Sequence, residues 1–241
     1  MTINKIDILA IGVHPDDVEL GASGTLLKHK DAGYTFGICD LTQGELGTRG
    51  SGALRLIEAE RSSKILGAQF RVNLGMKDGF FQHDEESIRK IISVIRACQP
   101  KIVLCNAPKD RHPDHGRASK LVSDACFYSG LVKIKTTANG TLQTTHRPDA
   151  VYHYIQDRSI KADLVVDISQ YIDQKIEAIM AFSSQFYDPK SNEPETPISS
   201  KNFIEFVKAK NKTYARDIQV EYAEGYTVER VIGIENLFDL R

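Results

Sequence analysis

The sequence predicts an α/β protein with a Rossmann-like three-layer fold, in which helices cover both faces of a mostly parallel sheet and a C-terminal cap follows. Short apolar segments rich in β-branched residues alternate with longer helical segments. Parallel strands need long crossover connections, and this alternation supplies them. The 241 residues include 41% apolar residues, which is ordinary for a globular protein with a sizeable core.

Strands and helices alternate regularly through the first half of the chain. The helix between Asp84, a suitable N-cap, and Pro100 is the clearest, because isoleucines at 88, 91, 92 and 95 fall on one helical face. Gly33 and Gly67 end two other helices. The predicted strands are 6–13, 35–41, 70–74 and 101–105, and the other predicted helices are 24–32, 53–66 and 118–128.

The pattern becomes less regular after Ser129. We predict strands at 150–155 and 164–167, a helix at 170–182, an irregular polar loop at 183–200 and a further helix from about Asn202. No repeat, low-complexity segment or linker interrupts the chain. We therefore expect one domain over 1–241, with a Rossmann-like half at 1–130 and the cap and C-terminal elements at 131–241.

Charge and cysteine content exclude several classes of protein. With 31 Lys and Arg against 32 Asp and Glu, the net charge is −1, which disfavours nucleic acid and membrane surfaces as partners. The apolar run Ile8–Val13 is too short for a signal-peptide core and has no cleavage site after it, so we expect a cytoplasmic protein. The four cysteines match no metal or disulfide pattern, and we expect them to be buried.

Two polar clusters follow predicted strands. His14-Pro15-Asp16-Asp17 comes directly after the first strand, and His112-Pro113-Asp114-His115 comes just after the fourth. In a sheet ordered 3-2-1-4 the first and fourth strands are neighbours whose crossovers go to opposite faces, which leaves a crevice between the two loops. The two clusters are therefore expected to form one site.

The residue types in these clusters suit a catalytic metal. His14 and Asp17, three residues apart, point to the same side of a turn or first helical turn, and His115 approaches from the neighbouring loop. Two histidines and one carboxylate leave an open position, as in catalytic zinc sites, and the same set suits Fe²⁺. Asp16 is then placed to act as general base. His112, with Asp114 as a possible orienting partner, is a candidate for stabilising an oxyanion or protonating an amine.

Two other enzyme classes require motifs that this sequence lacks. A dinucleotide-binding loop would need G-x-G-x-x-G after the first strand, whereas this loop carries a histidine and two aspartates. A serine hydrolase of the α/β-hydrolase type would need G-x-S-x-G, which does not occur.

The two clusters resemble the marks of the LmbE-like, or PIG-L, family of zinc-dependent de-N-acetylases, an H-P-D-D segment after the first strand and a later H-P-D-H segment. Further segments are similar to its bacillithiol-biosynthesis branch, whose members deacetylate N-acetylglucosaminyl malate. They are CDLTQGELGTRG (39–50), NLGMKDGFF (73–81), DRHPDHG (110–116), VYHYIQDR (151–158), SSQFYDP (183–189) and EYAEGYTVER (221–230). The resemblance covers nearly the whole chain.

This resemblance implies roles for individual residues. It implies one Zn²⁺ held by His14, Asp17 and His115, with Asp16 as general base and His112 as oxyanion stabiliser and acid. It also implies a small-molecule substrate, and trimers or hexamers. The implied substrate-binding residues are Arg55, Asp78 and, less directly, Glu45 and Arg49.

The resulting hypothesis is hydrolysis of an N-acetyl group with release of acetate. A malate portion would be dianionic, so a positive rim with Arg49 and Arg55 is expected. Two alternatives stay open: the same chemistry on another N-acetylated sugar, and a metal- or nucleotide-binding module without catalysis.

Overall fold

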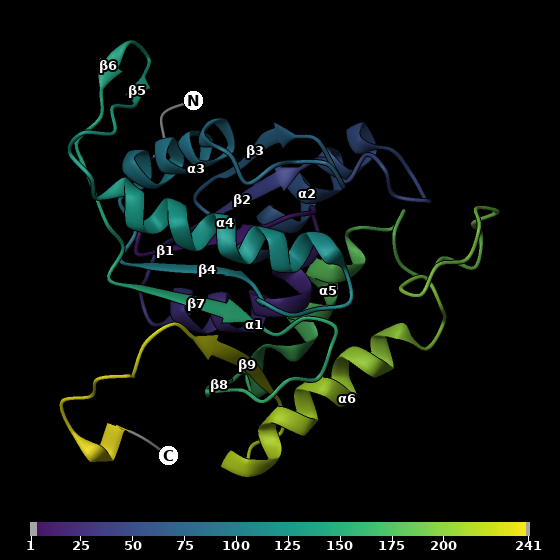
Figure 1. The fold of residues 1–241 in the computed structure, drawn as a ribbon. Helices are drawn as coiled ribbons and strands as arrows, with labels where there is room; N and C mark the ends of the chain where they lie inside the picture. Colours follow the sequence, from purple (N-terminus) through teal and green to yellow (C-terminus); the bar gives the residue numbers. More distant parts are fainter. Residues whose placement is uncertain (1–3, 240–241) are drawn as a thin grey trace.

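The computed structural model describes residues 4–239 and has a seven-stranded sheet between two layers of helices. The strand order is β3-β2-β1-β4-β7-β9-β8, and only β9 runs antiparallel to its neighbours. In Figure 1, α3 and α4 lie in front of the strands, and α1 and α5 lie behind them. The predicted α/β class, the Rossmann-like topology and the strand order 3-2-1-4 are confirmed.

The elements occupy the following ranges. The strands are β1 (Ile8–Gly12), β2 (Phe36–Thr42), β3 (Arg71–Met76), β4 (Ile102–Asn106), β5 (Thr137–Ala138), β6 (Thr141–Leu142), β7 (Ala150–Tyr154), β8 (Leu164–Asp167) and β9 (Ala223–Val228). The α-helices are α1 (Asp17–Asp31), α2 (Gly52–Leu66), α3 (Glu85–Cys98), α4 (Pro113–Ser129), α5 (Ile172–Met180) and α6 (Phe203–Ala215). Short 3₁₀ turns lie at Ser169–Tyr171, Arg216–Ile218 and Leu237–Asp239.

Two helices begin earlier than the sequence predicted. The predicted helix 24–32 is α1, which already begins at Asp17, and the predicted helix 118–128 is α4, which begins at Pro113. Residues 17–27 of α1 are all buried. This part of the helix therefore lacks the alternation of polar and apolar faces by which a helix is recognised in a sequence. These earlier starts place Asp17 and His115 in the first turns of their helices.

The sequence did not predict the strand β9 or the hairpin of β5 and β6. In β9 the carboxylate of Glu224 is buried and interrupts the apolar pattern of a strand. Lys175 on α5 donates to Glu224 Oε1 over 2.7 Å, and the main-chain N–H groups of Gly24 and Thr25 donate to the same carboxylate. The charge that hid the strand is thus fully paired inside the protein.

Apolar side chains pack on both faces of the sheet. Leu9 and Ile11 of β1 join a cluster with α3 and α4, and Ile8 and Ala10 of the same strand join a cluster with α1. Burial on both faces accounts for the continuous apolar sequence of β1. All four cysteines are free and buried, as predicted. Within residues 4–239, no helix has the length and apolar character needed to cross a membrane.

The fold leaves a crevice at the end of β1 and β4. These strands pair in parallel, with Ala10 opposite Leu104, so their carboxyl ends lie at the same edge. After β1 the chain enters α1 on one face of the sheet, and after β4 it enters α4 on the other face. The loops that carry the two polar clusters therefore separate at this point.

Candidate active site

Asp17 lies at the centre of the crevice, and its carboxylate is held by four hydrogen bonds. The main-chain N–H groups of Val13 and His14 each donate to Oδ2 over 3.0 Å, and Asn106 Nδ2 donates to it over 3.1 Å. Gln156 Nε2 donates to Oδ1 over 2.7 Å. Donors from the ends of β1, β4 and β7 thus fix both oxygens.

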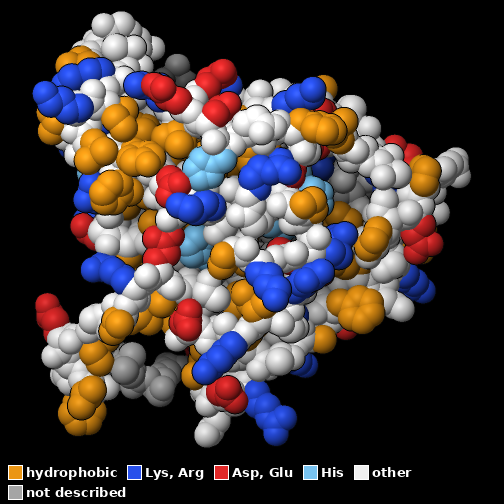
Figure 2. Space-filling view, viewed as in Figure 1, with side chains coloured by type: hydrophobic (Ala, Val, Ile, Leu, Met, Phe, Trp, Pro, Cys, Tyr) orange, Lys and Arg blue, Asp and Glu red, His pale blue; other side chains and the backbone are white. Residues whose placement is uncertain are grey.

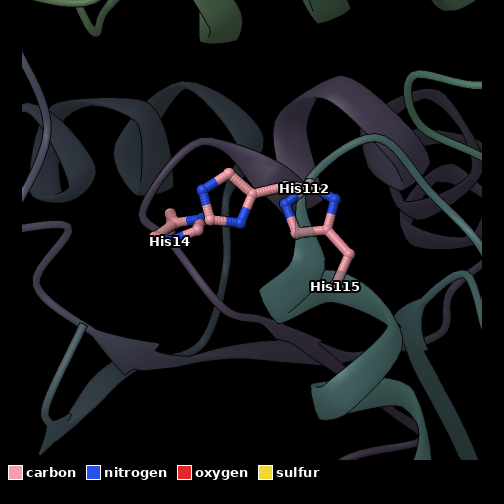
Figure 3. Close-up of side chains that lie close together, drawn as sticks. All are labelled: His14, His112 and His115. Atoms are coloured by element: carbon pink, nitrogen blue, oxygen red, sulfur yellow. The ribbon is translucent and has the colours of Figure 1, made fainter. Parts of the chain in front are cut away.

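The rings of His14 and His115 each lie near a different oxygen of this carboxylate. His14 Nδ1 lies 3.6 Å from Asp17 Oδ2, and His115 Nε2 lies 3.3 Å from Asp17 Oδ1. Ligand atoms around a tetrahedral zinc ion, each about 2.0–2.1 Å from it, lie about 3.3 Å from one another. The donor set and its spacing therefore fit a divalent cation. Figure 3 shows the rings of His14, His112 and His115, and one nitrogen from each ring lies within 4.8 Å of those from the other two.

A carboxylate braces the outer nitrogen of each ring. Asp78 Oδ1 lies 2.9 Å from His14 Nε2, and Asp110 Oδ2 lies 2.6 Å from His115 Nδ1. Such outer carboxylates orient metal-binding imidazoles and make the inner nitrogen more basic. The sequence reasoning missed Asp110, although it stands five residues before His115 in the DRHPDH segment.

The same carboxylates govern the protonation of the two rings. Burial lowers the pKa of His14, but its hydrogen bonds with Asp17 and Asp78 raise the pKa to about 9. Burial likewise lowers the pKa of His115, and Asp17 and Asp110 raise it to about 10. A cation requires neutral rings, so its binding at this site is coupled to the release of protons.

A second group of possible ligands shares His14. Its Nε2, Asp78 and Asp114 also offer atoms within 4.8 Å of one another, and all three residues are buried. The 2.9 Å between Nε2 and Asp78 Oδ1 is a hydrogen-bond distance, and this hydrogen bond lowers the pKa of Asp78 to about 2 against the effect of burial. Asp78 thus contacts the His14 ring, and because it also lines the cavity, its predicted contact with a substrate stays a prediction.

Asp16 is buried and forms an ion pair with Arg55. Arg55 Nη2 donates to Asp16 Oδ2 over 2.6 Å and to the carbonyl oxygen of Pro15 over 2.9 Å. Burial raises the pKa of Asp16 to about 7, and Arg55 opposes that rise. The φ angle of Asp16 is 138°, a region that non-glycine residues rarely occupy. The loop and Arg55 together fix this carboxyl group in the cavity that His14 and His115 also line.

His112 serves as the N-cap of α4. Its Nδ1 accepts a hydrogen bond from the main-chain N–H of Asp114 over 3.3 Å, so the neutral ring carries its proton on Nε2. Burial, followed by the nearby rings of His14 and His115, lowers the pKa of His112. The ring is thus a neutral donor at the site.

The Asp114 carboxylate is directed at partners other than His112. Asp114 Oδ2 accepts from the main-chain N–H of Gly79 over 3.0 Å, and Asp114 Oδ1 lies 3.2 Å from Arg117 Nη1. Only the main chain of Asp114 contacts the His112 ring. The carboxylate instead ties α4 to the loop after β3.

These groups line a cavity of about 790 Å³, within the range of small-molecule sites. Its walls include His14, Asp16, Asp17, His112 and His115, together with residues of the 183–200 loop and of α6. Figure 2 shows histidine side chains on this face of the molecule, with Lys and Arg side chains beside them.

Several known proteins are similar to this chain in sequence. The family described as GlcNAc-PI de-N-acetylase, PIG-L, matches residues 9–126. Diacetylchitobiose deacetylase of Thermococcus kodakarensis is 34% identical over 189 residues, which are 74% of this chain and 70% of that protein. The chain belongs to the PIG-L family.

Two further likenesses extend over most of the chain. A probable N-acetyl-alpha-D-glucosaminyl L-malate deacetylase 2 of Bacillus anthracis is 26% identical, over 76% of this chain and 83% of that protein. The crystal structure of the conserved protein TT1542 from Thermus thermophilus has a TM-score of 0.84 and 32% identity, and covers 95% of this chain and 98% of that one. The LmbE-like, PIG-L resemblance predicted from the motifs is confirmed.

Membership of the PIG-L family makes this chain an enzyme of the deacetylase kind, a hydrolase that acts on an amide C–N bond. PIG-L deacetylases are metal-dependent, and the close approach of His14, His112 and His115 agrees with that property.

Three predicted substrate-binding residues make other contacts. Glu45 accepts from the main-chain N–H of Asp78 through Oε1, and Arg49 Nε points toward Glu193 Oε2 at 3.7 Å. Neither residue lines the cavity. Arg55 does line it, but its guanidinium is directed at Asp16 and Pro15. Both guanidinium groups are thus directed at protein partners, and their contact with a substrate stays a prediction.

Proposed function

We propose that this protein is a metal-dependent deacetylase that hydrolyses the N-acetyl group of an N-acetylglucosaminyl sugar and releases acetate and a free amine. The convergence of His14 and His115 on the Asp17 carboxylate inside a substrate-sized cavity carries the proposal. The family of the chain supports the reaction, and the names of its relatives support the sugar.

His14, Asp17 and His115 would hold the cation, and their two-histidine, one-carboxylate set suits Zn²⁺ and also Fe²⁺. When bound, such a cation supplies Lewis acidity, which polarises an amide carbonyl and makes water more acidic near neutral pH. The outer carboxylates of Asp78 and Asp110 keep the two rings turned toward that position.

Asp16 and His112 supply the proton transfer and the hydrogen bond that amide hydrolysis needs. Since Asp16 Oδ2 is held by Arg55, Oδ1 is the oxygen that takes a proton from the attacking water and returns it to the departing nitrogen. A pKa of about 7 suits this exchange at neutral pH. The N–H of His112 Nε2 donates to the oxygen on which negative charge develops.

The two named relatives differ in the group that is bonded to the N-acetylglucosaminyl residue of their substrates. The resemblance to the bacillithiol-biosynthesis branch implies N-acetylglucosaminyl malate, and the Bacillus anthracis relative carries that substrate in its name. The Thermococcus kodakarensis relative is named for diacetylchitobiose. Both molecules present an N-acetylglucosaminyl residue, which is the part that the proposed chemistry requires.

An acetate-release assay tests the proposal. Protein freed of metal is compared with protein loaded with Zn²⁺ or Fe²⁺, on N-acetylglucosamine, N,N'-diacetylchitobiose and N-acetylglucosaminyl malate. We expect acetate from at least one sugar, and only with metal present. Stoichiometric metal binding without acetate from any of the three would instead support a binding module without catalysis.

A further inference from the structure

His153 is a buried histidine that the proposed hydrolysis does not use. It belongs to β7, which lies between β4 and β9 in the sheet (Figure 1). The residue is 4% exposed and does not line the cavity of the site, so a substrate in that cavity does not touch it. Any effect of His153 on the site must therefore pass through the residues that its ring contacts.

Both ring nitrogens of His153 face acceptors. Nδ1 lies 2.9 Å from the main-chain oxygen of Asn106, and Nε2 lies 2.9 Å from Glu229 Oε1. Carbonyl and carboxylate oxygens only accept hydrogen bonds, so each nitrogen carries a proton and the ring is an imidazolium. Burial lowers the pKa of the ring, but Cys105, Glu229 and the Asn106 carbonyl raise it to about 11. The ring is therefore charged at neutral pH.

The contact with Asn106 connects this charge to the Asp17 carboxylate. Asn106 is the last residue of β4, and its Nδ2 donates to Asp17 Oδ2 over 3.1 Å. Its Oδ1 accepts from the main-chain N–H of Val13 over 3.1 Å. The amide keeps both partners only while the main chain of Asn106 stays in place, and the imidazolium binds the carbonyl of that same residue. His153 thus holds the residue that orients Asp17.

The same ring contacts the helix that carries His115. Ser119 Oγ lies 2.9 Å from His153 Nδ1, and Ser119 stands four residues, about one turn, after His115 on α4. Ser119 is itself buried. One charged ring therefore contacts neighbours of two of the three proposed cation ligands, Asp17 and His115.

Glu229 supplies the opposite charge from the end of β9. Thr227 of β9 pairs with His153 across the two antiparallel strands, and Glu229 follows that strand directly. The Glu229 side chain is 37% exposed, so its carboxylate is only partly desolvated. A buried imidazolium without such a partner would be costly, because the desolvation of its charge would be uncompensated.

We infer that the charged ring of His153 is a positioning residue for the proposed cation site. Through Asn106 it orients Asp17. Through Ser119 it holds the part of α4 next to His115. The inference takes its cation ligands from the proposed function and rests on it in that respect. It concerns how tightly the cation is held, and no contact between His153 and substrate is involved.

The Zn²⁺ affinity of the whole protein, measured by competition with a chelator, tests the inference. His153→Gln keeps an amide donor and removes the charge. We expect the affinity to fall about tenfold, as for other groups that orient ligands without touching the metal. The KM for the N-acetyl sugar should not change. His146→Gln is the matched control, since His146 Nε2 lies 2.7 Å from the main-chain oxygen of Pro100, near the opposite end of β4, and its variant should bind Zn²⁺ like the wild type.

A second variant and a spectrum test the charge itself. Glu229→Gln leaves the ring in place and changes a partly exposed side chain, so it also serves if His153→Gln does not fold. We expect a smaller loss of Zn²⁺ affinity than in His153→Gln. In ¹⁵N spectra of histidine-labelled wild-type protein at neutral pH, both ring nitrogens of His153 should carry a proton. A bare nitrogen in this ring, or unchanged affinity in Glu229→Gln, would overturn the inference.

The remaining outcomes separate the inference from the proposed function. A wild-type protein that binds Zn²⁺ but releases no acetate from any N-acetyl sugar would overturn the proposed function and leave the positioning role intact. Acetate release by the wild type, with equal Zn²⁺ affinities in wild-type and folded His153→Gln protein, would overturn only the positioning role. An equal loss of affinity in His146→Gln would also overturn it, because the effect would then be one of general stability. Thermal unfolding shows that each variant is folded at the temperature of the titration.

Discussion

Arg55 Nη2 lies 2.6 Å from Asp16 Oδ2, and this buried ion pair joins α2 to the loop that carries the first polar cluster. The sequence resemblance implied that Arg55 binds substrate and that Asp16 is the general base. We propose that Arg55 positions Asp16, since it fixes one carboxyl oxygen and favours the ionised form, which lowers the pKa of Asp16. The first two predictions follow from this contact.

Replacing Asp16 by asparagine should remove the proton acceptor and keep the shape of the loop. We expect Asp16→Asn to lower kcat by about 10²–10⁴, the usual contribution of general base catalysis. Metal content, measured by atomic absorption, should stay at the wild-type level because Asp16 is outside the proposed ligand set of His14, Asp17 and His115. An Asp16→Asn enzyme with near wild-type kcat would refute the assignment of the base.

Removing the arginine should shift the pH dependence of the reaction. Arg55 lowers the pKa of Asp16, so Arg55→Met should raise that pKa. The base acts only when deprotonated, and the acidic limb of the kcat/KM profile should therefore move to higher pH. Arg61→Met is the control, because Arg61 is exposed on the same helix. An unchanged acidic limb in Arg55→Met would show that the ion pair does not set the titration of the base.

The outer carboxylate of Asp110 should strengthen metal binding without touching the metal. We expect Asp110→Asn to weaken Zn²⁺ affinity about 10- to 100-fold, as measured by competition with a chelator, because His115 loses its charged brace. Asp173→Asn, at an exposed position of α5, should leave the affinity unchanged. Equal affinities for Asp110→Asn and wild-type protein would argue against His115 as a ligand through Nε2.

The buried pair of Lys175 and Glu224 should matter for stability. Lys175→Met leaves the Glu224 carboxylate buried with only its remaining neutral donors, and we expect the free energy of unfolding to fall by about 3–5 kcal/mol. The exposed pair of Lys64 and Glu60 provides the comparison, since Lys64→Met should cost no more than about 1 kcal/mol. Denaturant titration measures both values. Similar decreases in the free energy of unfolding for Lys175→Met and Lys64→Met would contradict the statement that burial makes the first pair more important for stability.

The sequence by itself determined the fold and the identity of the two polar clusters. Strand 101–105 and the helix before Pro100 can be recognised from their own residues. The strand is a short continuous apolar run, and the isoleucines of the helix follow the helical period. Strand β9 escaped prediction because Glu224 finds its partner, Lys175, only in the folded protein. The start of α1 at Asp17 escaped because burial on all sides erases the helical pattern.

Only the tertiary structure decided how the site residues are used. The sequence shows which site residues are charged, but it does not show their partners, because each partner lies in a different loop or helix. This holds for Asp16, Arg55, Glu45 and Arg49. The fold directs Arg55 to Asp16, Glu45 to the main chain of Asp78, and Arg49 away from the cavity. It also brings α6 to the cavity, although that helix lies far along the chain from His112. Side-chain identity is a local property, whereas pairing and burial depend on which distant segments the packed core brings together.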